Sequence, residues 1–175
     1  MSSNTTQTLP PQHQNRQPGL ESDMNPRPVS EDLAYRPAGK LLGKKALITG
    51  GDSGIGKATA IYYAKEGADV AIVYLNEQTD AEETKRQVEQ EGRRCFLISG
   101  DLGQEVFCRQ VVDQTVREFG GLDIIVNNAA EQHPQPSVEQ ITPEQLERTF
   151  RTNVFSIFYL LRAAMPHLKP GSCII

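Results

Sequence analysis

The 175-residue sequence predicts an α/β fold, a doubly wound parallel sheet covered by helices on both faces. Two observations support this prediction. From about residue 44 onward, short apolar segments alternate with segments of helical periodicity, as expected for successive βαβ units. Polar and glycine-rich motifs directly follow the apolar segments. Ligands of such sheets bind there, outside the carboxyl ends of the strands.

The predicted elements occur in regular order along the chain. The first helix ends at Gly67, and the second begins with a predicted capping box at 79–82. A third helix carries Cys108 and Phe119 on its apolar face. Strands are expected at 44–49, 69–74, 94–98 and 122–126, and a fifth strand begins at 172–175.

A long helix is expected to begin at Thr142, where Thr, Pro143 and Gln145 form an N-terminal capping pattern. Apolar residues from Phe150 to Leu168 then recur at spacings of three and four. They predict a helix face buried in the core. Pro166 is expected to kink or end the helix.

The first forty residues differ in composition from the rest. They contain six prolines and four glutamines and too little apolar material to offset the entropy of ordering. We expect residues 1–40 to form a disordered polar tail and residues 41–175 to form the folded domain. Two alternatives are a segment draped over the domain near Tyr35 and a docking arm for another subunit.

Charge and cysteine content narrow the function classes. The net charge of −4 indicates neither a nucleic-acid-binding surface nor a basic patch for binding to a membrane. No apolar run is long enough to span a membrane, and the N-terminus lacks the pattern of a signal peptide. Cys95, Cys108 and Cys173 have no metal-ligand spacing, so we expect no metal site, reduced thiols and a cytoplasmic location.

A glycine-rich segment lies between the first strand and the first helix. Gly50, Gly54 and Gly56 permit a tight turn and close approach of the backbone to a ligand. The helix that follows, expected from Ile55 to Glu66 directly after Ser53 of the glycine-rich run, presents unpaired N–H groups at its N-terminus. The segment predicts binding of a dinucleotide pyrophosphate, although a glycine-rich turn without a ligand is the alternative.

The spacing T-G-x-x-x-G-I-G resembles the glycine signature of the short-chain dehydrogenase/reductase (SDR) family. Three further motifs are similar to those of this family and occur in the same order. They are Asp101-Leu102, Asn127-Asn128-Ala129 (with Ala130 in place of the usual Gly) and Asn153. The run from Thr49 to Lys57 behind the tail resembles glucose/ribitol dehydrogenase-like and NADPH-dependent aldehyde reductase-like members.

This resemblance implies a Rossmann-type fold with a bound nicotinamide cofactor. It implies that cofactor contacts come from the glycine segment, the end of the second strand, and the motifs after the third and fourth strands. Asn153 would belong to the catalytic tetrad. The residues implied to bind the cofactor are Gly50, Ser53, Gly54, Ile55, Gly56, Tyr74, Asp101, Leu102, Asn127, Asn128 and Ala129.

Each motif taken alone also has a structural explanation. Asp101 could cap the following helix, Asn127 and Asn128 could tie strands together, and Asn153 could be a buried polar residue. His133 fits a solvated loop, and His167 is favourable near a helix C-terminus. The occurrence of all motifs in family order favours the functional interpretation.

Cofactor preference depends on the end of the second strand. NAD-preferring members place an acidic residue where Tyr74 stands, whereas NADP-preferring members carry a basic residue at the positions of Leu75 or Ser53. The carboxylate that would exclude NADP(H) is absent, and so is the basic residue that would select it. Lys57 is nearby, but the sequence does not indicate whether its side chain points toward the cofactor. We expect NADP(H), with NAD(H) as the alternative, because nothing at Tyr74 repels a 2′-phosphate.

The family transfers a hydride between the nicotinamide and a CH–OH or carbonyl carbon by means of a Ser, a Tyr and a Lys. None of the five tyrosines here has a lysine four residues later. We therefore expect an inactive fragment of an NAD(P)-dependent oxidoreductase for small alcohols or carbonyls, a homotetramer in its full-length form. The alternatives are a non-catalytic dinucleotide-binding module and a decayed gene product.

Overall fold

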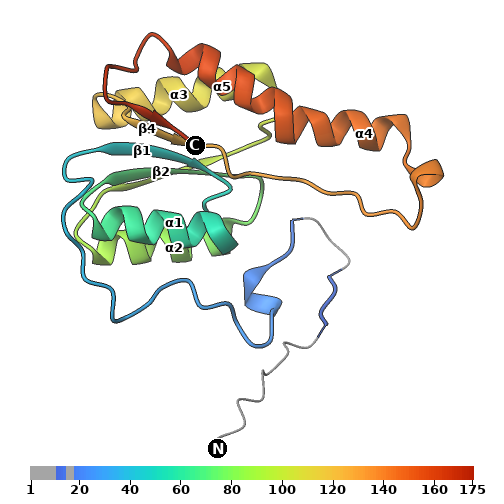
Figure 1. Cartoon of the computed structure of the whole chain (residues 1–175), viewed down its shortest axis with the longest axis horizontal. Coiled ribbons are helices and arrows are strands. Elements are labelled where there is room, and N and C mark those ends of the chain that lie inside the picture. The colour runs from blue at the N-terminus through green and yellow to red at the C-terminus, as the bar shows by residue number, and fades with distance from the viewer. Residues whose placement is uncertain (1–10, 15–17) are drawn as a thin grey trace, which may run out of the picture.

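The computed structural model describes residues 11–14 and 18–175, and within them the strands form one parallel sheet in the order β3-β2-β1-β4-β5 (Figure 1). The strands are β1 (Lys45–Thr49), β2 (Asp69–Tyr74), β3 (Cys95–Ser99), β4 (Ile124–Val126) and β5 (Cys173–Ile174). Because the strand order reverses beside β1, the loops after β1 and β4 diverge at the carboxyl edge of the sheet. The predicted doubly wound α/β fold is confirmed.

Helices cover both faces of the sheet. Figure 1 shows α1 (Gly54–Lys65) and α2 (Gln78–Gln90) on one face, and α3 (Glu105–Phe119) and α5 (Ser156–Ala164) on the other. Successive side chains of β1 alternate between the faces. Leu47 packs with the cluster under α3 and α5, whereas Ala46 and Ile48 pack with the cluster under α1. This two-sided burial explains the continuous apolar runs of the strands.

One of the two predicted capping boxes is present. Thr142 Oγ1 accepts the Gln145 N–H at 3.2 Å and Gln145 Oε1 accepts the Thr142 N–H at 3.1 Å, at the start of α4 (Pro143–Phe150). The box predicted at 79–82 is wrong, because α2 begins at Gln78, before Thr79 can serve as the cap. Asp80, expected in the box, instead accepts a backbone N–H from the N-terminal segment.

The long helix is interrupted between α4 and α5 by a π-helical turn, η3 (Arg151–Phe155). Such a turn adds a residue per turn and shifts the phase of the buried face. The prediction that the stripe from Phe150 to Leu168 is core is therefore only partly right. Phe150 is 46% exposed, and the buried residues of α5 are Ser156, Leu160 and Ala164. The helix ends before Pro166, as expected.

The described part of the N-terminal segment contacts α1. The Tyr35 ring packs edge-on against Tyr62 with centroids 4.8 Å apart, and its hydroxyl donates to the Glu66 carboxylate. Glu66 also accepts the N–H groups of Ala38 and Lys40. These contacts lie near Tyr35, where the alternative interpretation of the sequence places a segment lying over the domain. The domain boundary near residue 40 and the disorder of the tail stay predictions.

Across residues 11–14 and 18–175, every helix is too short or too polar to cross a membrane.

The environments of the three cysteines predict different reactivities. Burial raises the pKa of Cys95 and of Cys108 to about 12 each, whereas Cys173 in β5 is exposed. Because the thiolate is the reactive form, we expect one thiol to react quickly with Ellman's reagent at pH 8 and the other two only after unfolding. Cys173→Ser should remove the fast phase, and two or more fast thiols in the native chain would contradict this assignment.

Candidate functional site

A pocket of about 440 Å³ opens at the carboxyl edge of the sheet, beside the position where the strand order reverses. Loops after four strands contribute to its wall, with Gly50 following β1, Leu75 following β2, Asp101 following β3 and Asn128 following β4. Ligands bind at this position in doubly wound sheets. The pocket therefore lies where the sequence motifs were expected to converge.

Glycines shape the turn between β1 and α1. Gly50 and Gly54 have φ values of 62° and 53°, in the left-handed region that disfavours side chains. A Cβ atom on Gly56 would lie 1.9 Å from the Gly50 carbonyl oxygen, so the first turn of α1 can pack against the loop only without a side chain there. Ser53, the N-cap of α1, makes no side-chain capping bond. The N–H of Gly54, the first residue of the helix, instead donates to Glu21 Oε1 at 3.4 Å.

Asn128 and Thr49 hold this loop against the end of β4. Asn128 Nδ2 donates to the carbonyl oxygens of Thr49 at 2.9 Å and Gly50 at 3.0 Å. Thr49 Oγ1 donates to the Val126 carbonyl at 3.2 Å and accepts the N–H of Asn128 at 2.9 Å. Asn127 contacts the other neighbouring strand, because its Nδ2 donates to the Ile175 carbonyl directly after β5. Both amides tie neighbouring strands together, the structural role considered for them.

The structure brings most of the sequence-derived site residues to one pocket. Those that line it are Gly50, Ser53, Ile55, Tyr74, Asp101, Leu102, Asn128 and Ala129. Gly54, Gly56, Asn127 and Asn153 stand outside the lining. The assignment of cofactor-binding and catalytic roles stays a prediction for both groups of residues.

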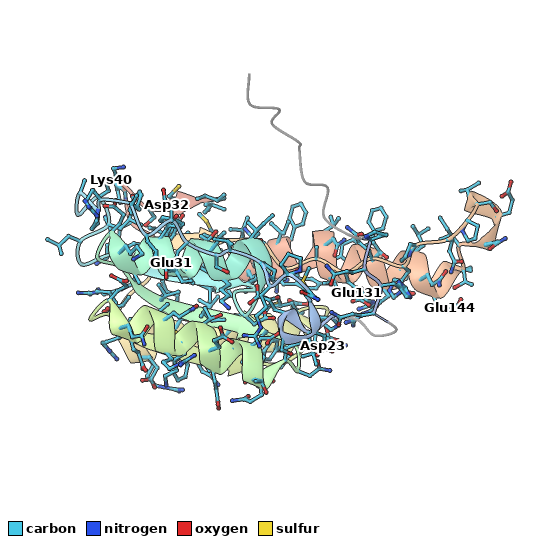
Figure 2. The ribbon with its side chains drawn as sticks, turned by 90° about the horizontal axis from the view of Figure 1, so that it is seen from below. Asp23, Glu31, Asp32, Lys40, Glu131 and Glu144 are labelled. Atoms are coloured by element: carbon cyan, nitrogen blue, oxygen red, sulfur yellow. The ribbon has the colours of Figure 1, made fainter. Side chains whose placement is uncertain are left out.

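A charged network that sequence reasoning missed joins the loops after β3 and β4 to α4. Arg148 Nη1 lies 2.6 Å from Asp101 Oδ2, and Arg148 Nε lies 2.8 Å from Glu131 Oε2. Thr152 Oγ1 donates to the same Glu131 oxygen at 3.0 Å, and His133 Nε2 lies 3.0 Å from Glu131 Oε1. In Figure 2, Glu131 lies nearer to the body of the domain than Glu144, which marks the start of α4. Arg148 is 47 positions from Asp101 and 17 positions from Glu131, so local sequence spacing does not predict that these three residues meet.

The Arg148 contact lowers the pKa of Asp101. Partial burial by itself would raise the pKa of Asp101, but the hydrogen bond from Arg148, together with the Gly103 N–H, lowers the pKa below its ordinary value. Asp101 is thus a carboxylate at neutral pH, held at the pocket wall. It does not act as the simple helix cap considered from the sequence, because the N-cap of α3 is Gln104.

Asn153 lies in the π-helical turn and anchors the loop after β4. Its Oδ1 accepts the Glu131 N–H at 2.8 Å, and its Nδ2 donates to the Glu131 carbonyl at 2.9 Å. The amide oxygen and the amide nitrogen of Asn153 therefore both bond to the backbone of Glu131. π-Turns of this kind often occur at functional sites. Here the turn brings Asn153 to the loop that carries Glu131 and the pocket residue Gln132.

Buried charges surround the glycine loop. Burial, and less strongly the nearby Glu77 and Asp80 carboxylates, raise the pKa of Asp52, which is 5% exposed. Lys57, whose direction the sequence left open, points away from the pocket. Its Nζ lies 2.6 Å from Glu21 Oε2 and 3.2 Å from Glu83 Oε1. Lys57 is therefore not available to a cofactor phosphate in this arrangement.

Comparison with known proteins identifies similar sequences and structures. The family model described as short chain dehydrogenase matches residues 44–175. General stress protein 39 of Bacillus subtilis (strain 168) is 62% identical over 172 residues, which are 98% of this chain and 60% of that protein. NADPH-dependent aldehyde reductase 1, chloroplastic, of Arabidopsis thaliana is 45% identical over 170 residues, 94% of this chain and 59% of that protein.

Among solved structures, a short chain dehydrogenase from Burkholderia cenocepacia J2315 in complex with NADP is similar, with a TM-score of 0.75 and 39% sequence identity. The match covers 77% of this chain and 55% of that one. The chain thus spans between about half and three fifths of the length of these proteins. The resemblance inferred from the four sequence motifs is confirmed at the level of the family.

The close approach of Gly56 to Gly50 can be tested by Gly56→Ala. Alanine normally stabilises a helix interior relative to glycine by up to about 1 kcal/mol. Here the 1.9 Å contact should outweigh that gain and lower the free energy of unfolding by about 1–3 kcal/mol. Urea denaturation measures the change. The matched control is Gly121→Ala, whose Cβ would meet no atom closer than 3.5 Å. Equal stability of Gly56→Ala and the wild type would refute the steric argument.

The Asp101–Arg148 pair predicts a pH-dependent contribution to stability. Because the folded pKa of Asp101 is lowered, this contribution is present above the unfolded pKa of about 3.9 and is lost as the pH falls through the folded pKa. Since both side chains are about 30% exposed, Arg148→Met should cost only about 1 kcal/mol at pH 7. The difference should shrink below about pH 4.

Denaturation of both proteins between pH 3 and pH 7 measures this effect. Arg151→Met is the control, since it removes an exposed helical ion pair with Glu147 that lies outside the network. A cost for Arg148→Met that stays constant from pH 7 to pH 3 would show that the arginine acts through packing alone.

Proposed function

This chain belongs to the short chain dehydrogenase family, and on that premise we propose that its pocket binds NADP(H). The observation that carries the proposal is that the start of α1 (Ser53 and Ile55), the glycine turn and polar residues from three further strand ends converge on one pocket. Helix N-termini and glycine-rich loops together favour a pyrophosphate. The residues of the pocket therefore fit a dinucleotide.

The arrangement at the end of β2 supports NADP(H) over NAD(H). Tyr74 and Leu75 line the pocket where a carboxylate would repel a 2′-phosphate. A relative is named an NADPH-dependent reductase, and a similar solved structure holds NADP. NAD(H) is the second candidate, because the pocket also contains the Asp52 carboxyl group, a hydrogen-bond acceptor suited to ribose hydroxyls.

For the whole protein we infer an oxidoreductase that acts on the CH–OH or carbonyl group of a small molecule. The bound cofactor would donate or accept the hydride. Asn153 would contribute by holding the loop after β4 at the pocket. A homotetramer and a cytoplasmic location stay predictions, as does catalytic inactivity of this chain as a fragment. Two alternatives stay open. A non-catalytic binding module would fold and bind the dinucleotide without turnover, whereas a decayed gene product would not fold cooperatively.

Titration of the chain with NADPH and NADH, followed by nucleotide fluorescence and calorimetry, tests the proposal. We expect saturable binding of both, with a lower dissociation constant for NADPH. The absence of binding by folded protein would overturn the proposal. Cooperative thermal unfolding, measured on the same sample, shows that the protein is folded and excludes the decayed product.

Leu75→Arg sharpens the test of cofactor choice. A guanidinium at the end of β2 should strengthen NADPH binding by about tenfold through a charge-assisted contact with the 2′-phosphate, and leave NADH binding unchanged. Leu75→Met is the control for the altered side-chain volume. An equal gain for both nucleotides would show that the 2′-phosphate lies elsewhere.

A further inference from the structure

The N-terminal segment forms part of the pocket wall. Pro18 and Gly19 line the pocket together with Ser53 and Ile55 from the glycine turn. Directly after them, η1 (Glu21–Asp23) lies close to the N-terminus of α1. In Figure 2, Asp23 of η1 lies at the end of the domain nearer to Glu131, whereas Glu31 lies farther back along α1. The family match begins only at residue 44, so this wall lies outside the matched region.

Glu21 attaches this segment to three places in the domain. Its Oε2 lies 2.6 Å from Lys57 Nζ, and its Oε1 accepts the Gly54 N–H at 3.4 Å. Its own backbone N–H donates to Asp80 Oδ2 at 2.9 Å. The contacts therefore reach the glycine turn, the interior of α1 and the first turn of α2. Glu21 is 9% exposed and Lys57 is 4% exposed, so the ion pair is buried.

A buried ion pair is weak evidence of added stability, but losing one partner leaves an uncompensated charge in the protein. Such a pair can therefore fix the position of a segment even where it adds little to the free energy of unfolding. Lys57 is held from its other side by Glu83 at 3.2 Å, which restricts where a second carboxylate can pair with it. The tail thus has a specific anchoring point at residue 21.

The chain before Glu21 is held by local hydrogen bonds. The Gln14 side chain donates from Nε2 to the Leu20 carbonyl at 2.8 Å and accepts the Leu20 N–H at Oε1 at 2.7 Å. Gln12 Oε1 likewise accepts the Asn25 N–H at 2.7 Å. These contacts bracket Pro18 and Gly19, so a loop fixed at Glu21 presents both residues to the pocket.

We propose that Glu21 is a positioning residue that holds Pro18 and Gly19 as a wall of the dinucleotide pocket through its buried pair with Lys57, so that docking of the N-terminal segment and cofactor binding are coupled. The inference rests on the proposed NADP(H) function. Coupling between two events is reciprocal: a docked segment raises cofactor affinity, and bound cofactor favours the docked segment.

A double-mutant cycle with NADPH as the probe tests the coupling in the full 175-residue chain. Glu21→Gln and Lys57→Met should each raise the NADPH dissociation constant by about fivefold or more, the lower end of typical coupling between linked sites. The NADPH dissociation constant of the double variant should be no higher than that of the more weakly binding single variant, because both substitutions remove the same anchor. Glu31→Gln is the matched control, since it removes an ion pair of the same segment with Lys65 without touching the pocket.

Two further measurements separate positioning from general stability. Deletion of residues 1–19 leaves the Glu21–Lys57 pair intact but removes Pro18 and Gly19, and should weaken NADPH binding with little change in melting temperature. Hydrogen exchange of a peptide covering residues 18–24 should slow on addition of NADPH in the wild type but not in Lys57→Met. A purely structural Glu21 would not produce this cofactor-linked protection.

The outcomes distinguish the two proposals. If the wild type binds NADPH while Glu21→Gln and the deletion bind equally well, the wall is dispensable and this inference is wrong, although the proposed function stands. If the folded wild type binds neither NADPH nor NADH, both are wrong. Should Glu21→Gln fail to fold, the deletion variant decides: unchanged affinity overturns the inference, and weaker affinity with normal melting supports it.

Discussion

The contact between the first turn of α1 and the Gly50 carbonyl is the constraint on which the site depends. The chain must leave the central strand and enter α1 within a few residues, and a side chain at residue 56 would fall 1.9 Å from that carbonyl. The same carbonyl accepts a hydrogen bond from Asn128, so the β1 turn and the end of β4 share one fixed point. With the turn held this way, Ser53 and Ile55 at the start of α1 line the pocket at the carboxyl edge of the sheet. A helix N-terminus in this position favours an anionic ligand, as the proposed function requires.

Charged side chains determine how the loops around this turn are arranged. On one side, Arg148 joins Asp101 after β3 to Glu131 after β4, and so connects two strand ends through α4. On the other side, Glu21 and Lys57 attach the N-terminal segment to α1. Arg148, Asp101 and Glu131 line the pocket, whereas Glu21 and Lys57 stand outside its lining, and none of these residues belongs to the hydrophobic clusters. Their energetic contribution to folding is expected to be modest, and their main effect is to define loop positions.

The π-helical turn between α4 and α5 connects packing to the site. By inserting a residue into the helical repeat it moves the buried face, so that Leu160 and Ala164 contact the core while Phe150 is largely exposed. The same turn carries Asn153, whose amide holds the backbone of Glu131 from both sides. A regular helix would keep a straight apolar stripe. The interruption instead gives the site a helix segment that reaches the loop after β4.

The sequence by itself determined the α/β class, the order of strands and helices, the glycine turn and the family, because each rests on local periodicity, turn chemistry or short motifs. Only the tertiary structure decided which residues share the pocket, where Lys57 points and how the N-terminal segment lies on the domain. Asp101 and Arg148 are brought together by the fold across 47 positions, as are Glu21 and Lys57 across 36. Sequence spacing carries no information about such pairs, since their distance depends on how helices pack on the sheet. The failed capping box at 79–82 and the shifted core stripe have the same cause: tertiary contacts outweigh local preferences that are worth about 1 kcal/mol each.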